Sequence, residues 1–281
     1  KTLTQIVVIA FALSSSSVQA KIPKTVQPLQ LPRDTVLGVL GGGQLGRMMA
    51  LAAANLGVKV MVLDPSERPP AAVASHAVKG HFRDATNIAD FASKVDVLTV
   101  EIEHVDAATL RALQTSGSAD IQPAPRTIAV IQDKFAQKQH FKKSGVALGE
   151  FCDIPNEAAL VLAGNKYGYP LMLKSKRLAY DGRGNYVVNS PSEHVAAVAK
   201  LGGFEHGLYA EKWQPFAKEL AVMVVRSRTG EVKLYPVTET IQKNNICHVT
   251  ETPALVSKAA EDAAVRLATQ AVASLQGAGV F

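Results

Sequence analysis

The chain has 281 residues, which is enough for two domains with buried cores. Hydrophobic residues make up 47% and charged residues 19%, as in globular proteins rather than disordered or membrane-embedded ones. The net charge of +6 is spread along the chain, and only 6% of the residues are aromatic. This composition argues against nucleic acid or a membrane as the partner and suits small phosphorylated ligands.

The first 34 residues differ from the rest, because they contain no acidic residue before Asp34. A short apolar run at 3–13 is followed by a serine-rich stretch at 14–20, and the run is too short to span a bilayer. A secretory signal, an organelle transit peptide and an upstream piece without a role all fit this pattern. We set residues 1–34 apart as a leader and linker.

Residues 35–125 alternate between predicted strands and helices. The apolar run at 35–40 predicts a buried strand, Gly41 to Gly43 the turn, 44–57 a helix, and 58–64 the next strand. Further strands are expected at 75–82 and 96–105, with helices at 86–95 and 106–117. Such alternation predicts a parallel α/β domain.

Residues 126–281 have a different pattern of apolar and polar residues. Prolines mark the boundary, and two helical stretches follow within 122–145. The pattern then predicts a strand, a glycine-bearing loop and a strand over 167–188, antiparallel strands over 207–249, and a helix over 257–277. Lys134, Lys138, Lys142 and Lys143 fall on or near one face of the early helices.

The glycine turn satisfies a dinucleotide-binding pattern. Gly41, Gly43 and Gly46 form G-x-G-x-x-G, and Asp64 ends the following strand, where a ribose-binding acid would stand. The start of a helix also attracts phosphate through its free N–H groups. A compact strand-to-helix turn favours small residues in any parallel sheet, so the pattern alone leaves the ligand open.

A second glycine loop, Ala179 to Asn185, lies between two strands. Its glycines predict a flexible flap, and Arg183, Lys174 and Lys134 place cations beside it. Cations and a water-excluding cover suit a triphosphate, whereas an ordinary hairpin with solvated charges is the alternative.

Two glutamates and two cysteines complete the candidates. Glu211 and Glu219 stand next to apolar strand segments and could accept hydrogen bonds from ribose hydroxyls or an adenine amine; two surface glutamates are the alternative. Cys152 and Cys247 have no metal-like spacing, so we expect two buried thiols in a reducing compartment.

Taken together, the motifs GGGQLGRMM, EIEHV, YDGRGN and YAEKWQPFAKEL resemble the ATP-grasp enzymes, and most of all the carboxyaminoimidazole ribonucleotide synthetases of purine biosynthesis. The resemblance runs from about Val36 to Phe281. It implies an α/β protein: a Rossmann-like, parallel α/β pre-ATP-grasp domain over 35–125, then an incomplete α+β ATP-grasp domain over 126–281.

The resemblance also implies roles for particular residues. ATP-binding positions are Lys134, Lys174, Ala179, Gly182, Gly184, Asn185, Glu211, Lys212, Trp213, Gln214, Glu219 and Gln242. The catalytic flap residues are Tyr180, Asp181 and Arg183, and the positions that face the ribonucleotide substrate are Gly43, Gln44, Leu45 and Glu101. Gln242 replaces a histidine that many members carry, so this contact is expected to differ.

The implied activity is the carboxylation of aminoimidazole ribonucleotide, with ATP, Mg²⁺ and bicarbonate, through carboxyphosphate. The parent protein would be this ligase alone or the ligase part of a bifunctional phosphoribosylaminoimidazole carboxylase. A homodimer is compatible with the resemblance. The expected location is a plastid or the cytoplasm. The metal ligands of the family lie beyond residue 281, so no metal ligand is expected here and this stretch by itself is expected to be inactive. The rivals are an NAD-dependent oxidoreductase and a non-catalytic nucleotide-binding remnant.

Overall fold

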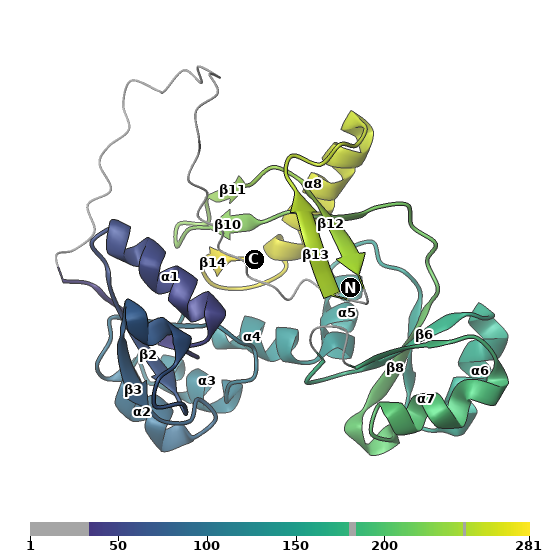
Figure 1. The fold of residues 1–281 in the computed structure, drawn as a ribbon, viewed down its shortest axis with the longest axis horizontal. Coiled ribbons are helices and arrows are strands. Elements are labelled where there is room, and N and C mark those ends of the chain that lie inside the picture. Colours follow the sequence, from purple (N-terminus) through teal and green to yellow (C-terminus); the bar gives the residue numbers. More distant parts are fainter. Residues whose placement is uncertain (1–33, 180–183, 244–245) are drawn as a thin grey trace. The chain divides into compact units, whose positions relative to one another are not determined.

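A computed structural model describes residues 34–179, 184–243 and 246–281. These residues form two compact units, and the boundary falls between Pro125 and Arg126 (Figure 1). None of the helices in these ranges is both long enough and apolar enough to cross a membrane.

The N-terminal unit is built on a parallel four-stranded sheet, as the alternating pattern predicts. Its elements are β1 Val36–Leu40, α1 Gln44–Asn55, β2 Lys59–Asp64, the 3₁₀ turn η1 Pro70–Val73, β3 His76–Lys79, α2 Ala85–Ala92, β4 Val97–Val100 and α3 Ala107–Thr115. The strand order is β3-β2-β1-β4, and every pairing is parallel. The carboxyl ends of β1, β2 and β4 therefore meet at one edge of the sheet, where the glycine turn begins.

The second unit opens with helices α4 (Pro125–Gln132) and α5 (Lys134–Lys143) and continues into an antiparallel sheet. The elements of this part are β5 Phe151–Ile154, α6 Glu157–Tyr167, β6 Leu171–Ser175, β7 Asn185–Val188, η2 Pro191–Glu193, α7 His194–Lys200, η3 Phe204–His206 and β8 Leu208–Lys212. The strand order is β5-β8-β6-β7.

The two faces of this antiparallel sheet have different chemistry, because side chains alternate along a strand. One face carries Ile154, Leu171, Leu173, Val188, Leu208 and Ala210, which pack with residues of α6 and α7 as a buried core. Both helices lie beside β6 and β8 (Figure 1). The register then directs Lys174, Asn185, Tyr209 and Glu211 to the opposite face. A one-residue slip would exchange the two sets, so burial of the apolar face fixes which side chains the polar face presents.

The remaining elements form two small antiparallel sheets and a long helix. They are β9 Glu219–Ala221, β10 Val224–Arg226, β11 Val232–Leu234, β12 Thr238–Lys243, β13 Ile246–Glu251, α8 Lys258–Ala273 and β14 Gly279–Val280. The strand orders are β13-β12-β9 and β11-β10-β14. α8 packs on Val224 of β10 in a core that also includes Val222 and Val237.

Arg226 joins β10 to the end of α8. Its guanidinium donates to the backbone carbonyls of Val272, Leu275 and Gly277 at 2.5–3.0 Å, and it lies 5.0 Å from the centre of the Phe281 ring. One cation thereby connects β10 to the last turn of α8 and to the segment that follows this helix.

Two expectations need correction. Cys152 and Cys247 are free thiols, but both are half-buried rather than buried. Glu211 lies within β8, not after it, because the hydrogen-bonded register of β8 with β5 and β6 extends to Glu211 and Lys212.

Candidate nucleotide site

The polar face of the β5-β8-β6-β7 sheet holds a cluster of two lysines and one glutamate. The Nζ atoms of Lys174 on β6 and Lys138 on α5 each lie 3.2 Å from the same oxygen, Oε1 of Glu211 on β8. The Lys174 side chain is only 7% exposed, and the other two are at most 20% exposed. Two cations share one carboxylate in a largely buried place, so the cluster has a surplus positive charge that an anionic ligand would offset.

Two buried polar atoms, one in this cluster and one on the neighbouring Tyr209, have unused hydrogen-bonding capacity. The hydroxyl oxygen of Tyr209 and Oε1 of Glu211 are buried without an aligned hydrogen-bond partner among the described residues, although Oε1 pairs electrostatically with both lysines. Burial raises the pKa of Tyr209, and the negative charge of Glu211 raises it further. Buried polar atoms without aligned partners are uncommon, and a polar ligand is one way to satisfy them.

Burial by itself would raise the pKa of Glu211, but the nearby Lys174 and Lys138 together hold it below its ordinary value of 4.5. A lowered folded-state pKa stabilises the fold above the unfolded value, and this contribution is lost as the pH falls through the folded value. We therefore predict that the free energy of unfolding falls between about pH 5.5 and 3.5, and falls less in Glu211→Gln. Urea denaturation at both pH values measures this, with the exposed Glu157→Gln as control; an unchanged pH dependence in Glu211→Gln would contradict it.

The described ends of the flap lie close together. A Cβ atom on Gly184 would stand 2.7 Å from the Cβ of Ala179, and Gly184 has a φ of +85°, so a side chain there would be strained and crowded. The Gly184 carbonyl accepts from the Ser175 N–H, and Asn185 pairs with Lys174 across β7 and β6. The candidate residues Tyr180, Asp181, Gly182 and Arg183 lie outside the described residues.

The predicted adenine-binding segment begins at the end of β8. Lys212 is tied to Glu150 by a backbone hydrogen bond of 3.0 Å and by an exposed ion pair of 2.9 Å. Trp213, the only tryptophan in the sequence, is 39% exposed, and Gln214 follows it toward β9. The segment therefore leaves the sheet directly from the strand that carries Glu211.

Glu219 and Gln242 meet on the second antiparallel sheet. Oε1 of Glu219 on β9 accepts from Nε2 of Gln242 at 2.7 Å and from the Thr240 hydroxyl at 2.5 Å, both on β12. Gln242 thus holds the carboxylate that the resemblance assigns to ribose.

The glycine turn of the N-terminal unit holds two carboxylates of the chain itself. The Gly43 and Leu45 N–H groups, at the start of α1, donate to the two oxygens of Glu101 at 2.6 and 3.2 Å. The Gly42 N–H donates to Asp64 at 2.9 Å. A Cβ on Gly43 would stand 2.6 Å from Glu101, so this glycine makes room for the internal carboxylate. The position that the pyrophosphate of a dinucleotide would take is filled by Glu101, which disfavours the NAD hypothesis.

No group of three or more histidine, cysteine, aspartate or glutamate side chains suited to a metal ion occurs among the described residues. The described residues therefore do not by themselves form a side-chain site for magnesium.

Comparisons with known proteins agree with this arrangement. A model of the ribonucleotide synthetase preATP-grasp domain matches residues 35–132, and a model of the ATP-grasp domain matches residues 139–281, about half of the chain. The chain belongs to the ATP-grasp family. The resemblance inferred from the motifs is thereby confirmed, as is the order of a parallel α/β domain before an ATP-grasp domain.

Individual relatives of this ATP-grasp chain have names from purine biosynthesis. A phosphoribosylaminoimidazole carboxylase from Ogataea methanolica is 49% identical over 250 residues, which cover 87% of this chain and 46% of the relative. The carboxyaminoimidazole ribonucleotide synthase of Aspergillus clavatus, solved with ATP, is 42% identical with a TM-score of 0.83, and the match covers 88% of this chain and 65% of that one. Its complex with ADP and 5-aminoimidazole ribonucleotide gives 40% identity, a TM-score of 0.80 and the same coverage. The chain spans about half the length of the curated relative it matches.

The structure brings the predicted ATP-binding residues into two groups. Lys174, Asn185 and Glu211 share one sheet face, and Glu219 and Gln242 share another sheet. Lys134 begins α5, and its N–H donates to the Lys176 carbonyl just after β6. The motifs did not single out Lys138 as a site residue, although its position four residues after Lys134 on a helix places it one turn farther along the same face.

Proposed function

We propose that this ATP-grasp chain binds ATP with its second unit and serves the ATP- and bicarbonate-dependent carboxylation of aminoimidazole ribonucleotide. One observation supports this most strongly: Lys174 and Lys138 share a single oxygen of Glu211, and the register of β6 with β8 directs Lys174 and Glu211 to one face of the sheet. A buried cation surplus of this kind suits the triphosphate of a nucleotide. The complex of an Aspergillus clavatus relative with ADP and 5-aminoimidazole ribonucleotide supports the choice of substrates.

The proposed reaction has two steps. A bicarbonate oxygen attacks the γ-phosphorus of ATP, the bond to the β-phosphate oxygen breaks, and carboxyphosphate and ADP form. The exocyclic amine of aminoimidazole ribonucleotide then takes the carboxyl carbon, phosphate leaves, and the nitrogen gives up one proton. Most of the catalytic work is positioning and charge stabilisation, as in phosphoryl transfer generally.

Each group of residues has a part in this proposal. Lys134 and Lys174 contact phosphates, Glu211 to Gln214 hold adenine, and Glu219, oriented by Gln242, accepts from the ribose. Ala179 to Asn185 cover the phosphates. Asp181 assists removal of the amine proton, Arg183 holds the transferred group, and Tyr180 contacts bicarbonate or the substrate amine. Gly43, Gln44, Leu45 and Glu101 face the ribonucleotide; Glu101 uses two of its acceptor sites on the loop and keeps others for a substrate hydroxyl. Mg²⁺ would neutralise the triphosphate, and no group of metal-ligating side chains for it occurs among the described residues. A homodimer is the proposed assembly.

The fluorescence of Trp213 tests the nucleotide part of the proposal, because this single tryptophan stands in the predicted adenine-binding segment. Titration with ATP is expected to change its emission with saturation, and NADH is expected not to compete. ATP turnover that depends on both bicarbonate and aminoimidazole ribonucleotide, measured in the protein that contains this chain, tests the reaction. Saturable binding of ATP without such turnover would favour the non-catalytic alternative.

The location is a separate proposal. A purine ligase acts where its substrates are made, so we expect residues 1–34 to direct a fused fluorescent reporter to a plastid or leave it in the cytoplasm. Microscopy of the fusion in cells checks this, with an unfused reporter as control. Export of the reporter to the medium would contradict it.

A further inference from the structure

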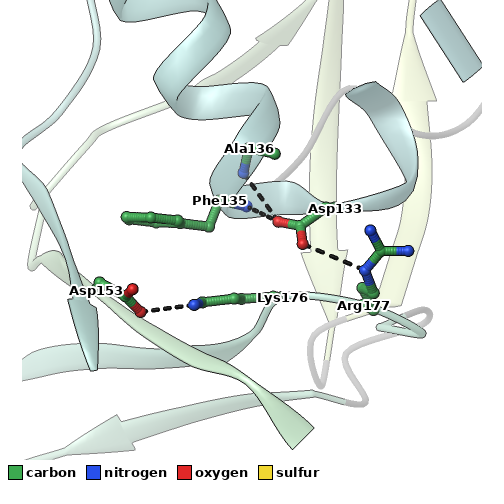
Figure 2. A network of polar contacts seen from close by, with 6 residues as sticks. All are labelled: Asp133, Phe135, Ala136, Asp153, Lys176 and Arg177. Carbon is green, nitrogen blue, oxygen red and sulfur yellow. Dashed lines mark hydrogen bonds and ion pairs between the residues drawn. The ribbon is translucent and has the colours of Figure 1, made fainter. Parts of the chain in front are cut away.

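The start of α5 and the segment that follows β6 are held together by two contacts. The Lys134 N–H donates to the Lys176 carbonyl at 2.7 Å. Nε of Arg177 lies 3.2 Å from Oδ2 of Asp133 (Figure 2). Lys176 itself is anchored to the sheet, because its Nζ lies 2.6 Å from Oδ1 of Asp153 on β5. The helix start is therefore fixed to the strand end through backbone and side chain together.

Asp133 uses its two carboxylate oxygens for different purposes. Oδ1 accepts from the Phe135 and Ala136 N–H groups at 3.1 and 2.9 Å, which makes Asp133 the N-cap of α5. Oδ2 receives Arg177 (Figure 2). Because both oxygens are engaged, the carboxylate fixes the direction of the helix start relative to the segment after β6. The Asp133 side chain is 18% exposed and the Arg177 side chain is 57% exposed, so the carboxylate is the shielded partner and the guanidinium lies at the surface.

The residues joined in this way stand next to the candidate phosphate-binding lysines. Lys134 directly follows Asp133 and is 3% exposed, so its place depends on where the helix begins. Lys174 lies three positions before Arg177, and Ala179, the first residue of the flap, lies two positions after it. Neither Asp133 nor Arg177 is among the residues that the motifs assign to ATP.

We propose that Asp133 and Arg177 form a clamp that positions Lys134 against the strand that carries Lys174, so that both lysines act on the phosphates of one nucleotide. The clamp rests on the proposed function, because it presupposes a phosphorylated nucleotide between these lysines. Asp133 and Arg177 are positioning residues: they set the separation of two cations without touching the ligand. Loss of the clamp should therefore weaken the binding of phosphates and leave the binding of adenine and ribose unchanged.

The experiment compares ATP with adenosine, which lacks phosphates, by titration of Trp213 fluorescence. Asp133→Ala removes both the cap and the ion pair and is expected to weaken ATP binding about tenfold, with adenosine unchanged within about twofold. Arg177→Gln removes the ion pair alone and is expected to weaken ATP binding about fivefold. Asp133→Asn should resemble Arg177→Gln, because an amide turned to cap the helix directs its NH₂ group toward Arg177. Asp106→Ala, which removes the equivalent N-cap from α3, is the matched control and should leave both ligands unaffected.

The double variant Asp133→Ala with Arg177→Gln separates a clamp from two independent contacts. Its effect on ATP binding is expected to match that of Asp133→Ala alone, because the two residues act through one contact. The clamp would be overturned by any of three results: additive losses of ATP affinity, equal losses of affinity for ATP and adenosine, or unchanged ATP binding. In each case the proposed function would still stand if the unmodified chain binds ATP more tightly than adenosine. If the unmodified chain binds ATP no more tightly than adenosine, the proposed function and the clamp both fail. Should Asp133→Ala not fold, as judged by circular dichroism, Asp133→Asn and Arg177→Gln decide, since both keep the helix cap.

Discussion

Lys174→Met is expected to weaken ATP binding by about a hundredfold, the largest effect of any single substitution in the site. Methionine has a similar length, so the change removes the charge with little loss of volume. Glu211 would keep only Lys138, and the cluster would lose the surplus positive charge that attracts a triphosphate. Titration of Trp213 fluorescence with ATP measures the loss.

The control for this prediction is Lys200→Met, because Lys200 is exposed at the end of α7 on the other side of the same sheet. It should leave ATP affinity unchanged. Binding of ATP by Lys174→Met within about threefold of the unmodified chain would show that Lys174 does not meet the phosphates.

Arg226→Ala is expected to destabilise the attachment of α8 by about 3 kcal/mol, because a partly buried cation that donates to three carbonyl groups is lost. The carbonyl groups of Leu275 and Gly277, which follow α8, would lose this donor and would have to bind water. Amide hydrogen exchange of α8 should then become faster by about a hundredfold, and mass spectrometry of peptides from 258–273 can follow it.

Arg226→Lys is the conservative comparison. A lysine keeps the charge but has no planar fork of donors, so we expect an intermediate exchange rate. Lys233→Ala removes an exposed charge from the same small sheet and serves as the neutral control. Equal exchange rates in Arg226→Ala and the unmodified chain would contradict the assigned role.

The parts of the fold that follow from short-range patterns could be predicted from the sequence. The apolar runs predicted β1 and β2, and the helical spacing predicted α1. Lys174, near the end of an apolar run, lies on β6 within the strand predicted there. α6 was not predicted, because the stretch at 157–167 has apolar residues around most of its circumference and lacks a clear polar face.

The site was predicted in its residue types but not in its pairings. Lys174 and Glu211 lie 37 positions apart, and the register of β6 with β8 decides that they share a face. Arg226 gave no signal, since its partners are backbone carbonyls 46 to 51 positions away, which every residue possesses. Asp133 could have been recognised as a helix cap, but its contact with Arg177 depends on how α5 meets β6.

The internal carboxylate at the glycine turn bears on whether the order of this turn depends on a bound ligand. In dinucleotide-binding proteins the ordered state of such a turn is supported by a metabolite, so that its stability varies with supply. Here Glu101 supplies the negative charge from within the polypeptide. The Gly43 and Leu45 N–H groups therefore have an anionic partner in the folded domain before any ligand binds.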